Sequence, residues 1–201
     1  MLDEPKRSAR PRSDDDNTLE LALLERIKRG DREALRQLYG RYYHALLRFI
    51  YRMTGQLELA KEGVNDVMLV VWRNGESFGG RSLVRTWIMG IAYRKALKLL
   101  ERSKRWSDRI EPDHGLWDDR EPSAHAVEPT SSLDLEDLLA RGLQELSPKH
   151  RAVVELTYFY GYSYEEIAAI ADCPVNTVKT RMFHARARLK ELLPQLAKDE
   201  P

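Results

Sequence analysis

The sequence contains almost no cysteine and no long apolar run. Cys173 is the only cysteine among the 201 residues, so the chain cannot form a disulfide within itself or a zinc site from several thiolates. No apolar run approaches the roughly 18 residues that a membrane-spanning helix needs. These absences argue against a disulfide-stabilised protein and a membrane-spanning one. They favour a reducing compartment, and we expect the protein to be cytoplasmic.

The residue patterns of common enzymes are also missing. The five histidines, at positions 44, 114, 125, 150 and 184, have no metal-ligand spacing, and neither a P-loop nor a nucleophile elbow is present. We therefore expect no catalytic residues, no metal site and no cofactor, which leaves an enzyme as the weaker interpretation.

Positive and negative side chains nearly balance over the whole chain, but single segments carry a strong excess of one sign. The chain has 33 Lys+Arg against 32 Asp+Glu. Residues 94–105 hold six basic residues and one acid, residues 107–137 hold ten acids and two arginines, and residues 176–190 hold five basic residues and no acid. Two basic blocks on either side of an acidic one predict two anion-binding surfaces and a separate middle segment. Ordinary solvated faces are the alternative.

Helical periodicity runs through most of the chain, and no alternation typical of strands is present. We predict an all-α fold of two small helical domains, residues 18–105 and 133–197, joined by an acidic flexible linker over residues 106–132. Residues 1–17 are polar and are expected to be a mobile tail. Capping residues and apolar spacing predict three helices in the first domain, at about 31–53, 58–72 and 82–103.

The second domain contains a helix-turn-helix pattern. Ser163 and Glu166 form a capping box, a short apolar helix follows, and residues 172–174 break it. The apolar residues of the next helix recur at spacings of four, three and four: Val178, Met182, Ala185 and Leu189. The remaining faces of that helix carry Lys and Arg, as in a helix that enters the major groove of DNA. An antiparallel helical hairpin with a basic face is the alternative.

Two parts of the chain resemble bacterial RNA polymerase sigma factors of the extracytoplasmic-function (ECF) family. The segment "LSPKHRAVVELTYFYGYSYEEIAAIADCPVNTVKTRMFHARARLKELL" is similar to the family's C-terminal domain, called region 4. The segments "EGVNDVMLVVWRN" and "SFGGRSLVRTWIMGIAYRKAL" are similar to the polymerase-binding and −10-reading parts of region 2. The matches stand in the family's order. The resemblance implies a sigma factor, which binds core RNA polymerase and directs promoter-specific transcription initiation without being a catalyst.

The resemblance also assigns roles to three sets of residues. Those matched to recognition of the −35 element are Asn176, Thr177, Lys179, Thr180, Arg181, Phe183, His184 and Arg186. Those matched to recognition and melting of the −10 element are Arg81, Arg85, Arg94, Lys95 and Lys98. Those matched to docking on core polymerase are Glu62, Asn65 and Asp66. The carboxylates of Glu62 and Asp66 would pair with basic residues of the polymerase clamp.

Two positions depart from the family's usual residues, and two aromatic residues could be either exposed or part of the core. Arg94 stands where many relatives have Asn, so the reading of the flipped −10 base is expected to differ. His184 replaces the usual Arg, which predicts a weaker phosphate contact at neutral pH because histidine ordinarily titrates near about 6.5. Phe183 is expected to be exposed, whereas Trp87 is expected to pack in the core.

Promoter DNA and core RNA polymerase are the partners that the resemblance implies, together with an anti-sigma factor that covers both domains, as is usual in the family. The acidic linker is expected to run toward the active-site and RNA-exit channels of the polymerase. A dimeric helix-turn-helix regulator is the main alternative function. It lacks a polymerase-docking domain, so the region 2 match argues against it.

Overall fold

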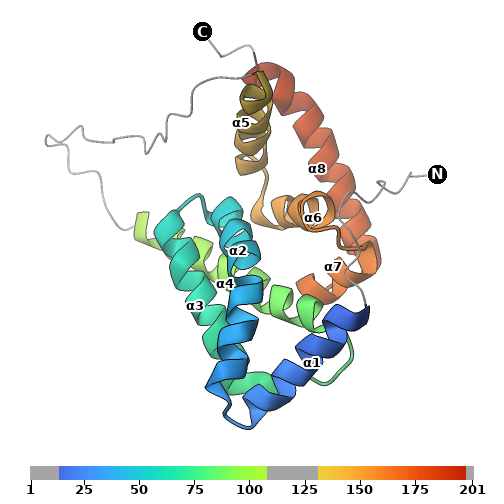
Figure 1. Ribbon diagram of the computed structural model, residues 1–201. Coiled ribbons are helices and arrows are strands. Elements are labelled where there is room, and N and C mark those ends of the chain that lie inside the picture. Colours follow the sequence, from blue (N-terminus) through green and yellow to red (C-terminus); the bar gives the residue numbers. More distant parts are fainter. Residues whose placement is uncertain (1–13, 108–130, 198–201) are drawn as a thin grey trace, which may run out of the picture.

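The computed structural model describes residues 14–107 and 131–197, and all regular structure in those ranges is helical (Figure 1). The elements are α1 (Asp14–Lys28), α2 (Arg32–Thr54), α3 (Leu57–Asn74), a 3-10 turn η1 (Gly75–Ser77), α4 (Val84–Ser107), α5 (Ser131–Gln144), α6 (Pro148–Tyr158), α7 (Tyr164–Ala171) and α8 (Val175–Leu196). The all-α prediction is confirmed. Most of the predicted acidic linker lies outside the described residues.

The first domain consists of α1–α4, and the three helices predicted for it are confirmed to within a few residues. The Asp31 carboxylate caps α2 by accepting hydrogen bonds from the main-chain N–H groups of Glu33 and Ala34, at 2.9 and 3.1 Å. Gly55 ends the same helix in the left-handed region, at φ 72°, where a residue with a side chain is strained. The two caps fix the length of α2.

Helix α1 was not foreseen, and it begins inside the range expected to be a tail. Leu23, Leu24 and Ile27 are buried, which holds α1 against the rest of the first domain. Near its start, the main-chain N–H of Val84 donates to Asn17 Oδ1 at 3.2 Å. The start of α1 therefore lies against the start of α4. Residues 1–13 of the expected tail lie outside the described residues.

The second domain consists of α5–α8 and contains the predicted helix-turn-helix, formed by α7 and α8. Ser163 caps α7 through the predicted box: its hydroxyl accepts from Glu166 N at 3.2 Å, and its own N–H donates to Glu166 Oε2 at 2.9 Å. Asp172 ends α7 at φ 49°. Helix α6 ends at Tyr158, before the turn that leads into α7.

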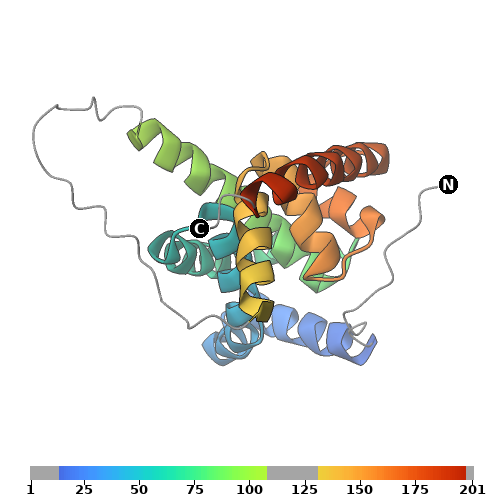
Figure 2. The ribbon, with the colours of Figure 1, turned by 90° about the horizontal axis from the view of Figure 1, so that it is seen from above.

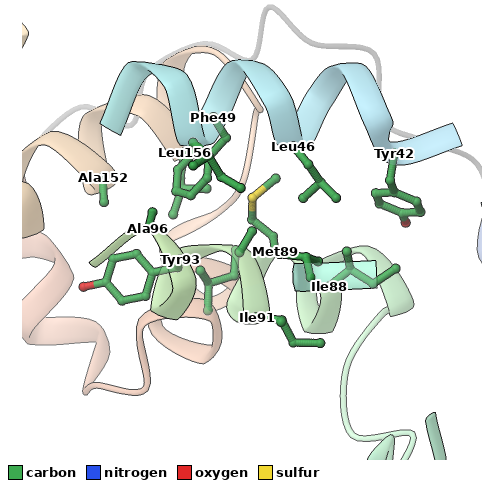
Figure 3. Close-up of a cluster of buried hydrophobic side chains, with 14 of the residues drawn as sticks. Tyr42, Leu46, Phe49, Ile88, Met89, Ile91, Tyr93, Ala96, Ala152 and Leu156 are labelled. Atoms are coloured by element: carbon green, nitrogen blue, oxygen red, sulfur yellow. The ribbon is translucent and has the colours of Figure 1, made fainter. Parts of the chain in front are cut away.

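The two domains pack directly on each other. Figures 1 and 2 show α7 of the second domain beside α4 of the first, and these two helices are in contact. Figure 3 shows that Phe49 of α2 and Met89 of α4 share one apolar cluster with Ala152 and Leu156 of α6. The two predicted helical domains are thus present, and their buried side chains form one continuous apolar core.

Candidate nucleic-acid and polymerase interfaces

The outer side of α8 carries most of the residues predicted to bind the −35 element. Val178, Met182 and Ala185 are buried, which turns the other faces of the helix outward. Six of the eight predicted residues are exposed: Asn176, Lys179, Thr180, Phe183, His184 and Arg186. No acid interrupts α8 before Glu191, so this side, which we call the α8 surface, is cationic.

Phe183 is 58% exposed, which confirms that it does not belong to the core. Its ring meets the neighbouring His184 ring edge-on, with centroids 5.5 Å apart. Arg186 donates a hydrogen bond to the Tyr158 hydroxyl of α6, which orients its guanidinium along the surface. The α8 surface therefore combines an aromatic ring with cationic groups, a combination suited to the backbone and base edges of DNA.

The two other predicted −35 residues, Thr177 and Arg181, are half-buried. The Arg181 guanidinium lies 3.6 Å from Cys173 Sγ in the turn before α8, and it interacts with the Tyr93 hydroxyl of α4. Burial raises the pKa of Tyr93, and the Arg181 charge opposes part of that rise. In this conformation Arg181 therefore faces the first domain.

The predicted −10 residues divide into exposed and ion-paired ones. Three are exposed: Arg81, Arg94 and Lys98. Arg85 forms an ion pair with Glu166, which belongs to α7 of the other domain, and its guanidinium lies 5.0 Å from the centroid of the Tyr162 ring. The Tyr162 hydroxyl in turn donates to the main-chain carbonyl of Arg85 at 3.4 Å. A residue predicted to contact −10 DNA is thus held by the helix-turn-helix.

Both carboxylates predicted to dock on polymerase have cationic partners on α4. Glu62 accepts two hydrogen bonds from the Arg102 guanidinium, at 2.9 and 2.8 Å. Asp66 accepts one from Lys95, itself a predicted −10 residue, at 3.1 Å. These pairs join residues far apart in the chain, so no local sequence pattern predicts them.

Two further predictions concern side chains of the first domain. Asn65 is exposed on α3, where its amide oxygen accepts a hydrogen bond from the Tyr39 hydroxyl at 3.1 Å. Trp87 packs against the core, with its ring centroid 5.4 Å from that of Phe78. Packing in the core is the role that was predicted for Trp87.

Arg151, on α6, is buried between the domains although no role was predicted for it. Its guanidinium donates to the main-chain carbonyls of Met53, at 2.7 Å, and Leu143, at 2.8 Å. It also donates to the side-chain and main-chain oxygens of Gln144, both at 2.6 Å. The helix ends of α2 and α5 thus share one buried cation.

Glu155, one turn further along α6, is a buried acid in the same interface. It is 1% exposed, and its nearest cation is Arg52, whose Nη1 lies 3.5 Å from Glu155 Oε2. Burial raises the pKa of Glu155 to about 7, against the opposing charges of Arg52 and Arg151. The only signal in the sequence was the spacing of four residues between Arg151 and Glu155, with the apolar run Ala152–Val154 between them.

The described residues contain no group of three or more His, Cys, Asp and Glu side chains placed to hold a metal ion. Among the helices of residues 14–107 and 131–197, none is both long and apolar enough to cross a membrane. The features that these ranges do offer are the cationic α8 surface, the ion-paired side of α4 and the acidic face of α3.

Comparisons with known proteins agree with the geometry. The family Sigma-70 region 2 matches residues 38–106, and the family Sigma-70, region 4 matches residues 136–189. The RNA polymerase sigma-H factor of Pseudomonas aeruginosa is 30% identical over 187 residues, covering 88% of this chain and 95% of the relative. The ECF RNA polymerase sigma-E factor of Escherichia coli (strain K12) is 31% identical over 171 residues, covering 82% and 88%.

Solved structures give the same result. CnrH in complex with the cytosolic domain of CnrY is similar in fold, with a TM-score of 0.64, 23% identity, and coverage of 90% of this chain and 99% of that one. The sigma factor RpoE of Bartonella quintana, in complex with the anti-sigma factor NepR, has a TM-score of 0.60, 27% identity, and coverage of 83% and 98%.

A helical protein with a region 2 domain followed by a region 4 helix-turn-helix is a transcription initiation factor. The chain belongs to the sigma-70 family of RNA polymerase sigma factors, within its extracytoplasmic-function group. Its function is promoter-directed transcription initiation through binding of RNA polymerase.

Proposed function

We propose that the α8 surface binds the −35 element of the promoter. The observation that carries this proposal is the exposure of Lys179, His184 and Arg186 on a helix whose opposite side is fixed in the core. Helix α7 packs against α8 and sets its angle, so that the first turns of α8 can enter the major groove. Exposed Thr180 and Phe183 are then the side chains closest to base edges.

The first domain, in this proposal, reads and melts the −10 element with α4 and the segment before it, and docks on core polymerase with α3. The exposed cations Arg81, Arg94 and Lys98 support a role in holding the separated strand. Glu62 and Asp66 are 43% and 40% exposed, so their ion pairs with α4 are solvent-screened and weak. Basic residues on the polymerase can therefore replace those partners and release Lys95 for DNA.

Binding both promoter elements at once requires the domains to separate. The centres of the −35 and −10 elements are about 25 base pairs apart, which is roughly 85 Å along B-form DNA at 3.4 Å per base pair. In the structure described above the two domains pack on each other, and we call this arrangement the closed conformation. In it α4 contacts α7, and Arg85 forms an ion pair with Glu166. Docking on polymerase and promoter is therefore accompanied by opening of this interface.

An anti-sigma factor is a further proposed partner. CnrH was solved with the cytosolic domain of CnrY and RpoE with the anti-sigma factor NepR, and both resemble this chain over most of its length. A protein that holds the closed conformation would keep α4 away from promoter DNA. We place the site of action in the cytoplasm, where core polymerase is found, and retain residues 18–105 and 133–197 as the proposed domain limits.

Selection of duplex DNA by the reconstituted holoenzyme tests the −35 assignment. Lys179→Ala is expected to weaken binding to the selected promoter by about tenfold and to relax the sequence preference within the −35 element only. Lys190→Ala is the matched control, because Lys190 is an exposed lysine further along α8 and outside the predicted set. Equal effects of the two substitutions would remove the case for the α8 surface.

A further inference from the structure

A pair of histidines joins α6 to α8 at the edge of the α8 surface. The centroids of the His150 and His184 rings lie 6.2 Å apart, with the ring planes tilted by 47°. His184 is exposed and belongs to the predicted −35 set, whereas His150 was assigned to no site. The pair extends the cationic surface from α8 onto the first turn of α6.

His150 is positioned by its own helix. Its Nδ1 lies 3.0 Å from the hydroxyl oxygen of Ser147, the residue that precedes α6. The ring is half-buried, so its orientation is set by packing as well as by this contact. With Nδ1 engaged locally, Nε2 is the nitrogen available to a ligand.

The charges around His150 are positive. Partial burial, followed by His184 and then Arg181 on α8, holds the pKa of His150 below its usual value. On α6 itself, Lys149 is exposed beside it, while Arg151 points into the domain interface. No carboxylate is among the causes of that shift. A proton on His150 therefore meets repulsion in the free protein, and an anion at the pair would relieve it.

A DNA phosphate suits this pair because of its charge and its place. It carries one negative charge and several acceptor oxygens, and each protonated imidazole donates through a charge-assisted hydrogen bond. The α8 surface beside the pair is the one proposed to lie against duplex DNA. A backbone phosphate bordering the groove is then the anion closest to His150 and His184.

We propose that His150 and His184 together bind a backbone phosphate of the −35 element in their protonated forms, so that −35 binding strengthens as pH falls from 8 to 6. This inference rests on the proposed function, since it needs the α8 surface to face −35 DNA. Each imidazole that is neutral in the free protein takes one proton from solvent as the complex forms. His150 is thus a −35 contact supplied by α6, outside the helix-turn-helix.

Fluorescence anisotropy of the holoenzyme on a labelled duplex carrying its −35 element tests the inference, at constant ionic strength between pH 6 and pH 8. Because the pair binds the phosphate in its protonated form, affinity is expected to be about tenfold higher at pH 6 than at pH 8. His150→Gln should reduce that ratio to about threefold. In the double variant His150→Gln/His184→Gln, the two histidines should no longer contribute to the ratio of the affinities at pH 6 and pH 8.

Lys149→Gln is the matched control. It removes a cation next to His150 and leaves both imidazoles in place, so it should weaken binding by a similar factor across the range. Calorimetry in buffers of different ionisation enthalpy gives a second readout: wild type should take up protons on binding at pH 7, and the double variant fewer. Glu155 is unchanged in every variant, so its own titration cancels from these comparisons.

A pH ratio for His150→Gln equal to that of wild type would overturn the inference. That result, together with binding at pH 8 that still depends on Lys179, would leave the proposed −35 function standing. Absence of −35-dependent binding at every pH would overturn the proposed function itself, and this inference with it.

Discussion

The guanidinium of Arg151, on α6, donates a 2.7 Å hydrogen bond to the main-chain carbonyl of Met53, near the end of α2. The main-chain carbonyls in the last turn of a helix accept no hydrogen bond from the helix itself, so they need a donor from elsewhere when they are buried. The same guanidinium reaches the Leu143 carbonyl at the end of α5. One cation therefore ties the first domain to the second.

Replacing Arg151 with Met should destabilise the closed conformation, because the Met53 carbonyl of α2 loses the guanidinium that donates to it. The Leu143 carbonyl of α5 would keep only its hydrogen bond from the Leu146 N–H. The expected loss in the free energy of unfolding is about 2–4 kcal/mol, the cost of removing several hydrogen bonds to a buried charged group. Urea denaturation of the free protein measures it. Arg188→Ala is the control, since Arg188 is 55% exposed on α8 and should change stability by less than about 0.5 kcal/mol.

Glu155 predicts a pH dependence of stability. Its pKa is raised from 4.5 to about 7 in the folded protein, because burial disfavours the charged form. Between pH 4.5 and 7 the folded state keeps a proton that the unfolded state has released, so this group's contribution to stability falls as pH rises through that window. The full difference is about 3 kcal/mol, at 1.36 kcal/mol per unit.

Glu155→Gln should therefore raise the melting temperature at pH 8 and leave it little changed at pH 5. The amide keeps the shape of the side chain without a charge that must be buried. Melting curves of the two proteins at several pH values, compared as a difference, cancel the other titrating groups. A constant difference from pH 5 to pH 8 would contradict the assignment of a raised pKa to Glu155.

The Arg85–Glu166 pair predicts that the domain interface can be loosened by a single neutralisation. Glu166→Gln should favour opening by about 1 kcal/mol, or about fivefold, because the pair is only half-buried, while glutamine still completes the capping box with Ser163. Energy transfer between dyes on cysteines at positions 61 and 190, in a Cys173→Ser background, reports the opening.

Glu165→Gln is the control for this experiment. Glu165 neighbours Glu166 on α7 but is exposed, and no ion pair involving it is found in the described residues. Transfer efficiency should fall for Glu166→Gln, stay constant for Glu165→Gln, and fall furthest for wild type bound to core polymerase. Unchanged efficiency on adding core polymerase would mean that the closed conformation persists in the holoenzyme.

Much of this structure follows from local signals. Asp31 and Gly55 mark the two ends of α2, and Ser163 with Glu166 marks the start of α7, because caps are satisfied within a few residues of the chain. The apolar spacing of α8 likewise indicated which of its faces is exposed. These features need no knowledge of distant residues.

The domain interface could not be predicted in the same way. Arg151 and Glu155 look like ordinary surface residues until α2 is placed over α6, because their partners Met53 and Arg52 are about a hundred residues away. Helix α1 was missed although several of its residues are apolar, because it begins with an acidic stretch inside the segment expected to be a tail. The contact between Arg181 and Tyr93 also depends on how the two domains pack together, because the two residues belong to different domains.

Docking on polymerase gives a prediction specific to α3. Asp66→Asn should weaken binding to core polymerase by about three- to tenfold, because a carboxylate aimed at a basic clamp surface is lost. Glu58→Gln is the matched control: Glu58 lies in the first turn of the same helix, 84% exposed, and pairs with Lys61. Titration of labelled protein with core polymerase compares the two, and equal affinities would exclude Asp66 from the docking surface.

Run-off transcription with purified core polymerase and a library of promoter fragments tests the central claim most directly. Transcripts should require this chain, share a −35 and a −10 sequence, and fall about tenfold with Lys179→Ala but not with Lys190→Ala. DNA binding by the chain without core polymerase, and no promoter-specific transcripts in its presence, would contradict the account.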